Sequence, residues 1–326
     1  MGKKKKSSKR PPAAEQSGGS VEEQPVAALS DEQKAELAEL DEQLEKFEQQ
    51  KRWSDYIRTL TKKADIVVDP AEKIALLTKA GTLFVERSSN QAESIKCFER
   101  VLELDPHNAE AIERLKEMYE KRRDWEGLIG VMRREAEMLD EGERLSRYLE
   151  MAALATERLR KPNVCIELWE LVRKAEPGHP EALEALVTLY ERSREWEPLT
   201  HVLEELIAGV TDEKELKQHL QKLGMIYADK IENDEGAIRT FRRLLDFDPD
   251  DRRAQEQLKR RYVATKAWDE LQVFYEEGEK WDELIRIFER EAEGKDASDA
   301  DKVELLTRVA VLWQEKKGKA DRAARA

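Results

Sequence analysis

The sequence predicts an all-α protein, and composition, strand signals and an internal repeat support that fold class. Charged and hydrophobic residues each make up 40% of the 326 residues, a balance typical of amphipathic helices with solvated outer faces. The chain holds only 14 glycines and 10 prolines, which is a poor supply of turn residues for an all-β fold. Strand signals are weak, because the β-branched run Ile66-Val67-Val68 stops at once at Asp69-Pro70.

Four tryptophans set the period of the repeat. Trp53, Trp125, Trp196 and Trp268 lie 72, 71 and 72 residues apart. An aromatic position, a small position and a helix-ending proline keep the same register: Phe98, Trp169, Phe241; Gly81, Ala152, Gly224; Pro106, Pro177, Pro249. A period of about 72 residues accommodates two helix pairs, so we expect an α-solenoid in which successive pairs stack on one another.

The stretch 220–249 carries the clearest motif. Its first helix has apolar and small residues on one face and its second helix has a small residue, an aromatic residue and a final proline: Leu220, Leu223, Gly224, Tyr227, Ala237, Phe241, Pro249. This pattern resembles the tetratricopeptide repeat, W-x2-L-G-x2-Y followed by A-x3-F and P. The resemblance implies antiparallel helix pairs, in a bacterial-type scaffold protein of that family.

The two pairs in each 72-residue unit differ. The first pair resembles the family motif, and all three of its copies hold one extra residue near the turn, which lengthens either the first helix or the loop. The other pair reads A-x3-L-x3-Y-x5-W-x2-L, as at Ala111, Leu115, Tyr119, Trp125 and Leu128. This second pattern departs from the family, because an aromatic residue opens its second helix.

We expect two regions, a disordered basic tail at residues 1–29 and a solenoid at residues 30–326. Residues 1–28 hold six basic and three acidic residues, so that they carry +3 and the remainder of the chain carries −16. So few apolar residues cannot offset the entropy of ordering. The tail could meet an acidic partner, a membrane surface or nucleic acid, act as a nuclear-localisation-like signal, or only keep the protein soluble.

The repeat is irregular at two places. The Y-x5-W signal returns early at Tyr275 and Trp281, 13 residues after Tyr262 and Trp268, so 267–293 should hold an extra or shortened helix. That helix is either a duplication that the core absorbs or a local kink that forms a special site. After Trp313 the last pair stops short, which predicts the N-terminal portion of a longer protein or, as the rival explanation, dimerisation through the open end.

The sequence shows no sign of catalysis. The four histidines form no HExxH or Cys/His cluster, no phosphate-binding glycine motif occurs, and we expect no metal and no cofactor. Cys97 and Cys165 lie in helical patterns without CxxC spacing, which favours reduced, packed thiols and a cytoplasmic protein. No run of 18 apolar residues occurs, so we expect no transmembrane segment. The acidic body argues against direct nucleic-acid binding, with the basic tail as the exception. The tryptophans could stack on RNA bases, but Leu128, Leu199 and Leu271 follow Trp125, Trp196 and Trp268 by three residues, which is core spacing.

The family resemblance implies a concave groove lined by the first helix of each pair, which binds a peptide or a partner protein. By motif alignment the exposed groove positions are Thr78, Lys79, Thr82, Glu86, Leu149, Glu150, Ala153, Glu157, Gln221, Lys222, Met225 and Asp229. Thr82, Ala153 and Met225 stand where one subclass has the asparagine of its carboxylate clamp, so that clamp is absent. We therefore expect a protein-interaction scaffold that is not an enzyme. The alternative is a half-a-TPR scaffold of an RNA-processing assembly.

Overall fold

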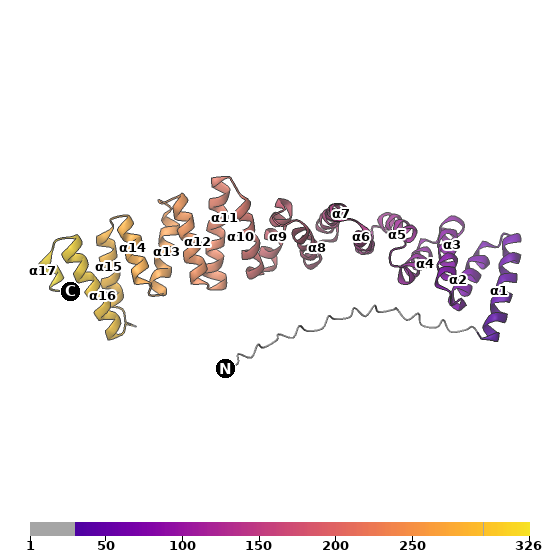
Figure 1. Cartoon of the computed structure of the whole chain (residues 1–326), viewed down its shortest axis with the longest axis horizontal. Coiled ribbons are helices and arrows are strands. Elements are labelled where there is room, and N and C mark those ends of the chain that lie inside the picture. The colour runs from indigo at the N-terminus through magenta and orange to yellow at the C-terminus, as the bar shows by residue number, and fades with distance from the viewer. Residues whose placement is uncertain (1–29, 296) are drawn as a thin grey trace, which may run out of the picture. The chain divides into compact units, whose positions relative to one another are not determined.

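The structure is a computed structural model that describes residues 30–295 and 297–326. Within these ranges it has seventeen α-helices and no β-strand, so the prediction of an all-α solenoid is confirmed (Figure 1). The predicted basic tail lies outside the described residues. None of the described helices is long and apolar enough to span a membrane.

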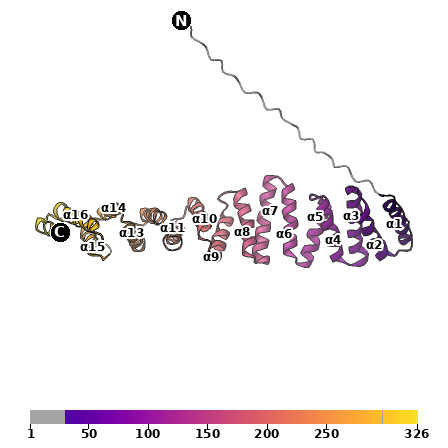
Figure 2. The same cartoon turned by 90° about the horizontal axis from the view of Figure 1, so that it is seen from below.

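The chain divides into two compact units, with the boundary after Met138. In the first unit short turns connect the helices, and each helix packs against the next one along the chain (Figure 2). These helices are α1 (Asp31–Gln49), α2 (Trp53–Ile66), α3 (Pro70–Ser88), α4 (Gln91–Leu104), α5 (Ala109–Arg122) and α6 (Trp125–Met138).

The second unit, Leu139–Ala326, continues the same pattern of paired helices. Three of its helices pass directly into a π-helical turn, labelled η. The elements are α7 (Glu141–Leu154), η1 (Ala155–Leu159), α8 (Pro162–Ala175), α9 (Pro180–Ser193), α10 (Trp196–Gly209), α11 (Glu213–Ile226), η2 (Tyr227–Ile231), α12 (Asp234–Phe247), α13 (Arg252–Ala264), α14 (Trp268–Glu277), α15 (Trp281–Ala292), α16 (Asp299–Val311), η3 (Leu312–Lys316) and α17 (Ala320–Ala323).

Local sequence explains where the helices start and stop. A capping box opens α1, with the Ser30 side chain accepting from the Gln33 amide and the Gln33 side chain accepting from the Ser30 amide. At the other end of a helix, α4 stops at Leu104, two residues before Pro106. The residue before that proline, Asp105, is extended, because the proline ring disfavours the helical conformation of its predecessor.

In two of the three motif-bearing pairs a glycine of the first helix packs against an aromatic ring of the second. A Cβ atom added to Gly224 in α11 would lie 2.7 Å from the Phe241 ring in α12, and one added to Gly81 in α3 would lie 2.8 Å from the Phe98 ring in α4. Such distances are shorter than a side-chain contact allows. Glycine is therefore required at both positions for the paired helices to approach this closely.

The extra residue in the motif-bearing pairs lengthens the first helix. In the second unit α7 and α11 each end in a π-helical turn, η1 and η2. These turns lie near the loop of each pair, where the sequence has one residue more than the tetratricopeptide motif. A π turn accommodates one additional residue without breaking the helix. Left-handed residues then end these turns, Arg160 after η1 and Glu232 after η2.

Candidate protein-binding site

The predicted groove residues lie on the first helices of three pairs, and none of them is buried. Thr78, Lys79, Thr82 and Glu86 lie on α3 of the first unit. In the second unit, α7 with η1 carries Leu149, Glu150, Ala153 and Glu157, and α11 with η2 carries Gln221, Lys222, Met225 and Asp229. The rows on α3 and in the second unit are therefore two separate surfaces, one in each unit.

The row on α3 is partly engaged by its neighbours. The Lys79 ammonium lies 2.5 Å from the Tyr56 hydroxyl oxygen and 5.1 Å from the centroid of the Tyr56 ring, so it contacts α2. The Thr82 hydroxyl donates to the Thr78 carbonyl over 3.0 Å. Lys79 thus presents a charge whose position is set by Tyr56, and the Thr82 hydroxyl is occupied by its own helix.

Ion pairs connect consecutive first helices in the second unit. The Lys222 ammonium on α11 lies 2.6 Å from a carboxylate oxygen of Glu191 on α9. At the other end of the same helix, Asp229 on η2 lies 3.5 Å from Arg261 on α13. Exposed pairs of this kind contribute little stability. They do show that α9, α11 and α13 present neighbouring polar surfaces.

Apolar side chains lie between these charges. Leu149 and Ala153 on α7 and Met225 on α11 are half-buried, so part of each remains accessible. Glu150 on α7 accepts a hydrogen bond from Arg147 over 2.5 Å. A surface of small apolar patches framed by charged groups suits recognition of a protein chain.

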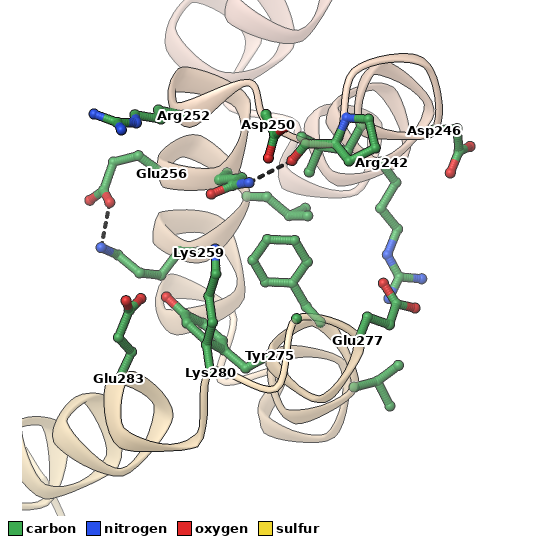
Figure 3. A pocket seen from close by; sticks show the side chains of 17 residues that line it. Arg242, Asp246, Asp250, Arg252, Glu256, Lys259, Tyr275, Glu277, Lys280 and Glu283 are labelled. Atoms are coloured by element: carbon green, nitrogen blue, oxygen red, sulfur yellow. Dashed lines mark hydrogen bonds and ion pairs between the residues drawn. The ribbon is translucent and has the colours of Figure 1, made fainter.

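The structure also contains a hollow in the second unit that the sequence prediction did not locate. It has a volume of about 980 Å³ and lies where α12, α13 and α14 meet the start of α15 (Figure 3). Its lining residues are Arg242, Leu245, Asp246, Pro249, Asp250, Arg252, Gln255, Glu256, Leu258, Lys259, Val273, Phe274, Tyr275, Glu277, Gly278, Lys280 and Glu283. The early return of the Y-x5-W signal at 275–281 is the sequence feature that lies nearest to it.

Side chains from three helices surround this hollow. Figure 3 shows Arg242 from α12, Lys259 from α13, and Tyr275 and Glu277 from α14 around one open space. Lys259 forms an ion pair with Glu256 on its own helix. Burial raises the pKa of Tyr275 to about 12, so its hydroxyl stays protonated at neutral pH. The hollow thus combines donors, carboxylates and aromatic surface.

A metal site is not formed by the side chains of residues 30–295 and 297–326: they contain no group of three or more histidine, cysteine or acidic residues that could hold an ion. The free thiols of Cys97 and Cys165 are both buried, in α4 and α8. Burial raises the pKa of each thiol, that of Cys97 to about 11. These thiols pack as small apolar groups.

No family model matches the chain, and no curated protein matches it. Solved structures with a distant likeness include the TPR domain of P58(IPK), at 13% identity and a TM-score of 0.32, covering 89% of this chain and 82% of that one. MamA matches at 16% identity and a TM-score of 0.27, covering 52% and 91% of the two chains. YrrB, a TPR protein described as having an unusual peptide-binding site, matches at 15% identity and a TM-score of 0.27, covering 56% of this chain and 89% of that one.

The fold assignment rests on the chain's own helices. Stacked antiparallel pairs, glycine–aromatic contacts such as that of Gly224 with Phe241, and the 72-residue register occur together in it. Each unit of the described chain is an array of stacked antiparallel helix pairs, as the resemblance to the tetratricopeptide repeat implies.

Proposed function

We propose that the protein is a non-catalytic scaffold that binds a peptide or a partner protein along the first helices of its pairs. In the second unit this surface comprises the rows on α7 with η1 and on α11 with η2, together with α9 between them. The row Thr78, Lys79, Thr82 and Glu86 on α3 forms the corresponding surface of the first unit.

The observation that carries the proposal is the ion pair between Lys222 and Glu191. It bridges the first helices of two successive pairs, so the residues beside it form one continuous surface rather than isolated helix faces. Met225 lies one turn from Lys222 on the same helix and is half-exposed. An accessible apolar side chain beside a fixed charge pair supports binding of a chain segment with both apolar and charged groups.

Site-specific photo-crosslinking tests this surface. A photo-crosslinking amino acid at Met225 should capture a partner in cells, and the same amino acid at Arg243, exposed on the second helix α12, serves as the matched control. The proposal predicts a species captured at position 225 and absent at position 243. Capture of the same species at both positions would contradict it.

Charge reversal separates recognition from stability. Lys222→Glu should weaken binding of the captured partner, as should Glu150→Lys on α7 of the same unit. The double variant Lys222→Glu with Glu191→Lys restores the ion pair in the opposite orientation. If the partner reads the charge of Lys222, the double variant stays weak. If it regains full binding, Lys222 only supports the fold and the assignment of this row is wrong.

A cytoplasmic location is part of the same proposal. The two cysteines lie in different units, and both thiols are buried and unpaired with each other. Reduced, packed thiols are the usual state of cysteine in reducing compartments.

A further inference from the structure

The first helices of the three Tyr-Trp pairs expose different charges at the same positions of the repeat. These helices are α5 in the first unit and α9 and α13 in the second, and the first buried residue of each is an alanine, namely Ala111, Ala182 and Ala254. Directly before that alanine stand Glu110, Glu181 and Arg253, and six residues after it stand Glu117, Thr188 and Arg260. All six of these side chains are exposed, so core packing does not dictate the change to arginine in the third copy.

Within the second unit, the exposed charges of α9 and α13 are therefore opposite in sign. The exposed charged side chains of α9 are those of Glu181, Glu184, Glu191 and Arg192. Those of α13 are Arg252, Arg253, Glu256 and Arg260. Three carboxylates accompany one cation on α9, whereas three cations accompany one carboxylate on α13.

Contacts within the chain account for some of these charges. Glu191 is paired with Lys222 of α11, and Glu256 is paired with Lys259 of its own helix. Arg252 lines the hollow at α12, α13 and α14 and belongs to that surface. Within residues 30–295 and 297–326, the other exposed charges of the two helices form no ion pair: Glu181, Glu184 and Arg192 on α9, and Arg253 and Arg260 on α13.

The helix α11 lies between the two charged helices. The ion pairs described above connect it to α9 and, through η2, to α13 (Figure 1). Its half-buried Gln221 and Met225 carry no charge. Because Arg192 lies near the C-terminal end of α9, the first two turns of α9 expose only acidic charges. The surface thus runs from acidic α9, over neutral and partly apolar α11, to basic α13.

We propose that the first-helix surface of the second unit binds a polypeptide segment whose charges are separated along its length. Its basic end pairs with Glu181 and Glu184, an apolar side chain in its middle packs on Met225, and its acidic end pairs with Arg253 and Arg260. This inference rests on the proposed function, because it names the chemistry of the partner that the same surface binds.

Charge separation is the property that such a surface selects. A uniformly acidic segment, or the phosphates of a nucleic acid, would be attracted by α13 and repelled by α9, and a uniformly basic segment would meet the reverse. Exposed ion pairs are individually weak, so complementary charges at both ends contribute more to the choice of partner than to total affinity.

Peptides of equal composition test this selectivity. The separated probe is acetyl-Lys-Lys-Ala-Ala-Leu-Ala-Ala-Glu-Glu-amide, and the mixed probe is acetyl-Lys-Glu-Ala-Ala-Leu-Ala-Ala-Lys-Glu-amide. Nine extended residues span about 30 Å, which is enough to cross three neighbouring first helices at an axial spacing of about 10 Å. NMR titration of the full chain with labelled methionine methyl groups reports binding at Met225, and the Met225→Leu variant assigns that signal.

At low salt the separated probe should bind about tenfold more tightly than the mixed probe and should shift the Met225 signal. In about 1 M salt this preference should disappear, because the screening length falls to about 3 Å.

A charge exchange on α13 should change the preferred peptide. The double variant Arg253→Glu with Arg260→Glu places on α13 the residues that α5 has at these positions, so it should fold normally. It should lose the preference for the separated probe and bind acetyl-Lys-Lys-Ala-Ala-Leu-Ala-Ala-Lys-Lys-amide about tenfold more tightly than the unchanged protein does. The control, Arg243→Glu with Arg286→Glu, makes the same change in net charge at exposed positions of α12 and α15 and should keep the original preference.

Equal affinity for the separated and mixed probes at low salt would overturn the proposal, as would equal effects of the two double variants. Tighter binding of a peptide with glutamate at both ends would also overturn it and would point to a polyanion. Crosslinking at Met225 decides the binding surface independently. A captured species together with equal peptide affinities would refute the charge separation alone, whereas absence of any captured species would refute the proposed function itself.

Discussion

The ammonium of Lys316 lies 4.7 Å from the centroid of the Trp281 ring, and the two residues are 35 positions apart. The ammonium of Lys230 likewise lies 5.5 Å from the centroid of the Trp196 ring, and these two residues are 34 positions apart. In both cases a cation at the end of a first helix covers the tryptophan that opens the preceding second helix. Trp281 therefore occupies the position of Trp196, and α15 is the regular second helix before α16.

It follows that α14 is the additional helix. The first unit shows the same relation, with Arg87 at 4.9 Å from the Trp53 ring and 34 positions after it. Trp268, which opens α14, is instead buried and packs edge-on against Phe288, with ring centroids 6.0 Å apart. Its environment is that of a core residue between α14 and α15.

Deleting residues 268–280 should therefore leave a folded protein. The deletion joins Ala267 directly to Trp281, and the four residues at the junction remain Trp-Asp-Glu-Leu, because this sequence opens both α14 and α15. We expect an unchanged helical signal per residue in far-UV circular dichroism and a cooperative thermal transition. Deletion of the 13 residues 196–208 removes a regular second helix and should abolish that transition. Equal damage from both deletions would show that α14 is not the additional helix.

The helix pairs could be predicted from the sequence because their contacts are local. Gly224 and Phe241 lie on consecutive helices, so their repeated spacing reports their contact directly. Whether Lys79 is free to bind a ligand depends on Tyr56 of the preceding helix, which motif alignment does not reveal. The hollow depends on where α14 ends, which is decided by packing. One departure was visible in the sequence, because an arginine, Arg242, stands at the repeat position that Glu99 and Glu170 hold in the other copies.

Two helical glycines should respond in opposite directions to alanine. Gly224→Ala forces a methyl group against the Phe241 ring and should lower the free energy of unfolding by about 1–3 kcal/mol. Gly130 lies inside α6, and an added Cβ meets no atom within 4 Å. Gly130→Ala should therefore raise the free energy of unfolding by about 0.5–1 kcal/mol. Chemical denaturation of both variants measures these changes, and a loss at position 130 would contradict the packing described here.

The buried thiols should react slowly in the folded protein. Burial raises the pKa of the Cys97 thiol to about 11, so only a small fraction is thiolate at pH 8. Because the thiolate is the reacting species, we expect a disulfide reagent to modify Cys97 about a hundredfold more slowly in the native than in the denatured chain, and Cys165 to be slowed as well. The Cys165→Ala variant isolates the rate of Cys97. Full modification at the denatured rate would show that the thiol is accessible.

The start of α16 should make stability depend on acid pH. A hydrogen bond from Lys266 and further ones from Ser298 lower the pKa of Asp301 to about 2. Because the folded pKa lies below the ordinary value of 3.8, the stabilisation is complete above about pH 4 and is lost as the pH falls toward 2. Asp301→Asn should thus lower the melting temperature near pH 6 and make little difference near pH 2. Asp299→Asn, on the same helical turn, is the control, and a pH-independent effect of Asp301→Asn would contradict this origin.

Two buried tyrosines should differ in what their hydroxyl groups contribute. Tyr190→Phe removes the donor to Glu170 and leaves that carboxylate without this hydrogen bond, so it should lower the free energy of unfolding by about 1–3 kcal/mol. Tyr262→Phe removes a buried hydroxyl that has no partner in the described chain, so the free energy of unfolding should stay constant or rise.

Urea denaturation of the two phenylalanine variants, with the Arg242→Glu variant alongside, measures this difference. Residue 242 occupies the repeat position of Glu170, so in the Arg242→Glu background the Tyr262 hydroxyl gains a carboxylate acceptor. Tyr262→Phe should then become destabilising, as Tyr190→Phe is. A loss of stability from Tyr262→Phe in the unchanged chain would mean that the hydroxyl already has an acceptor.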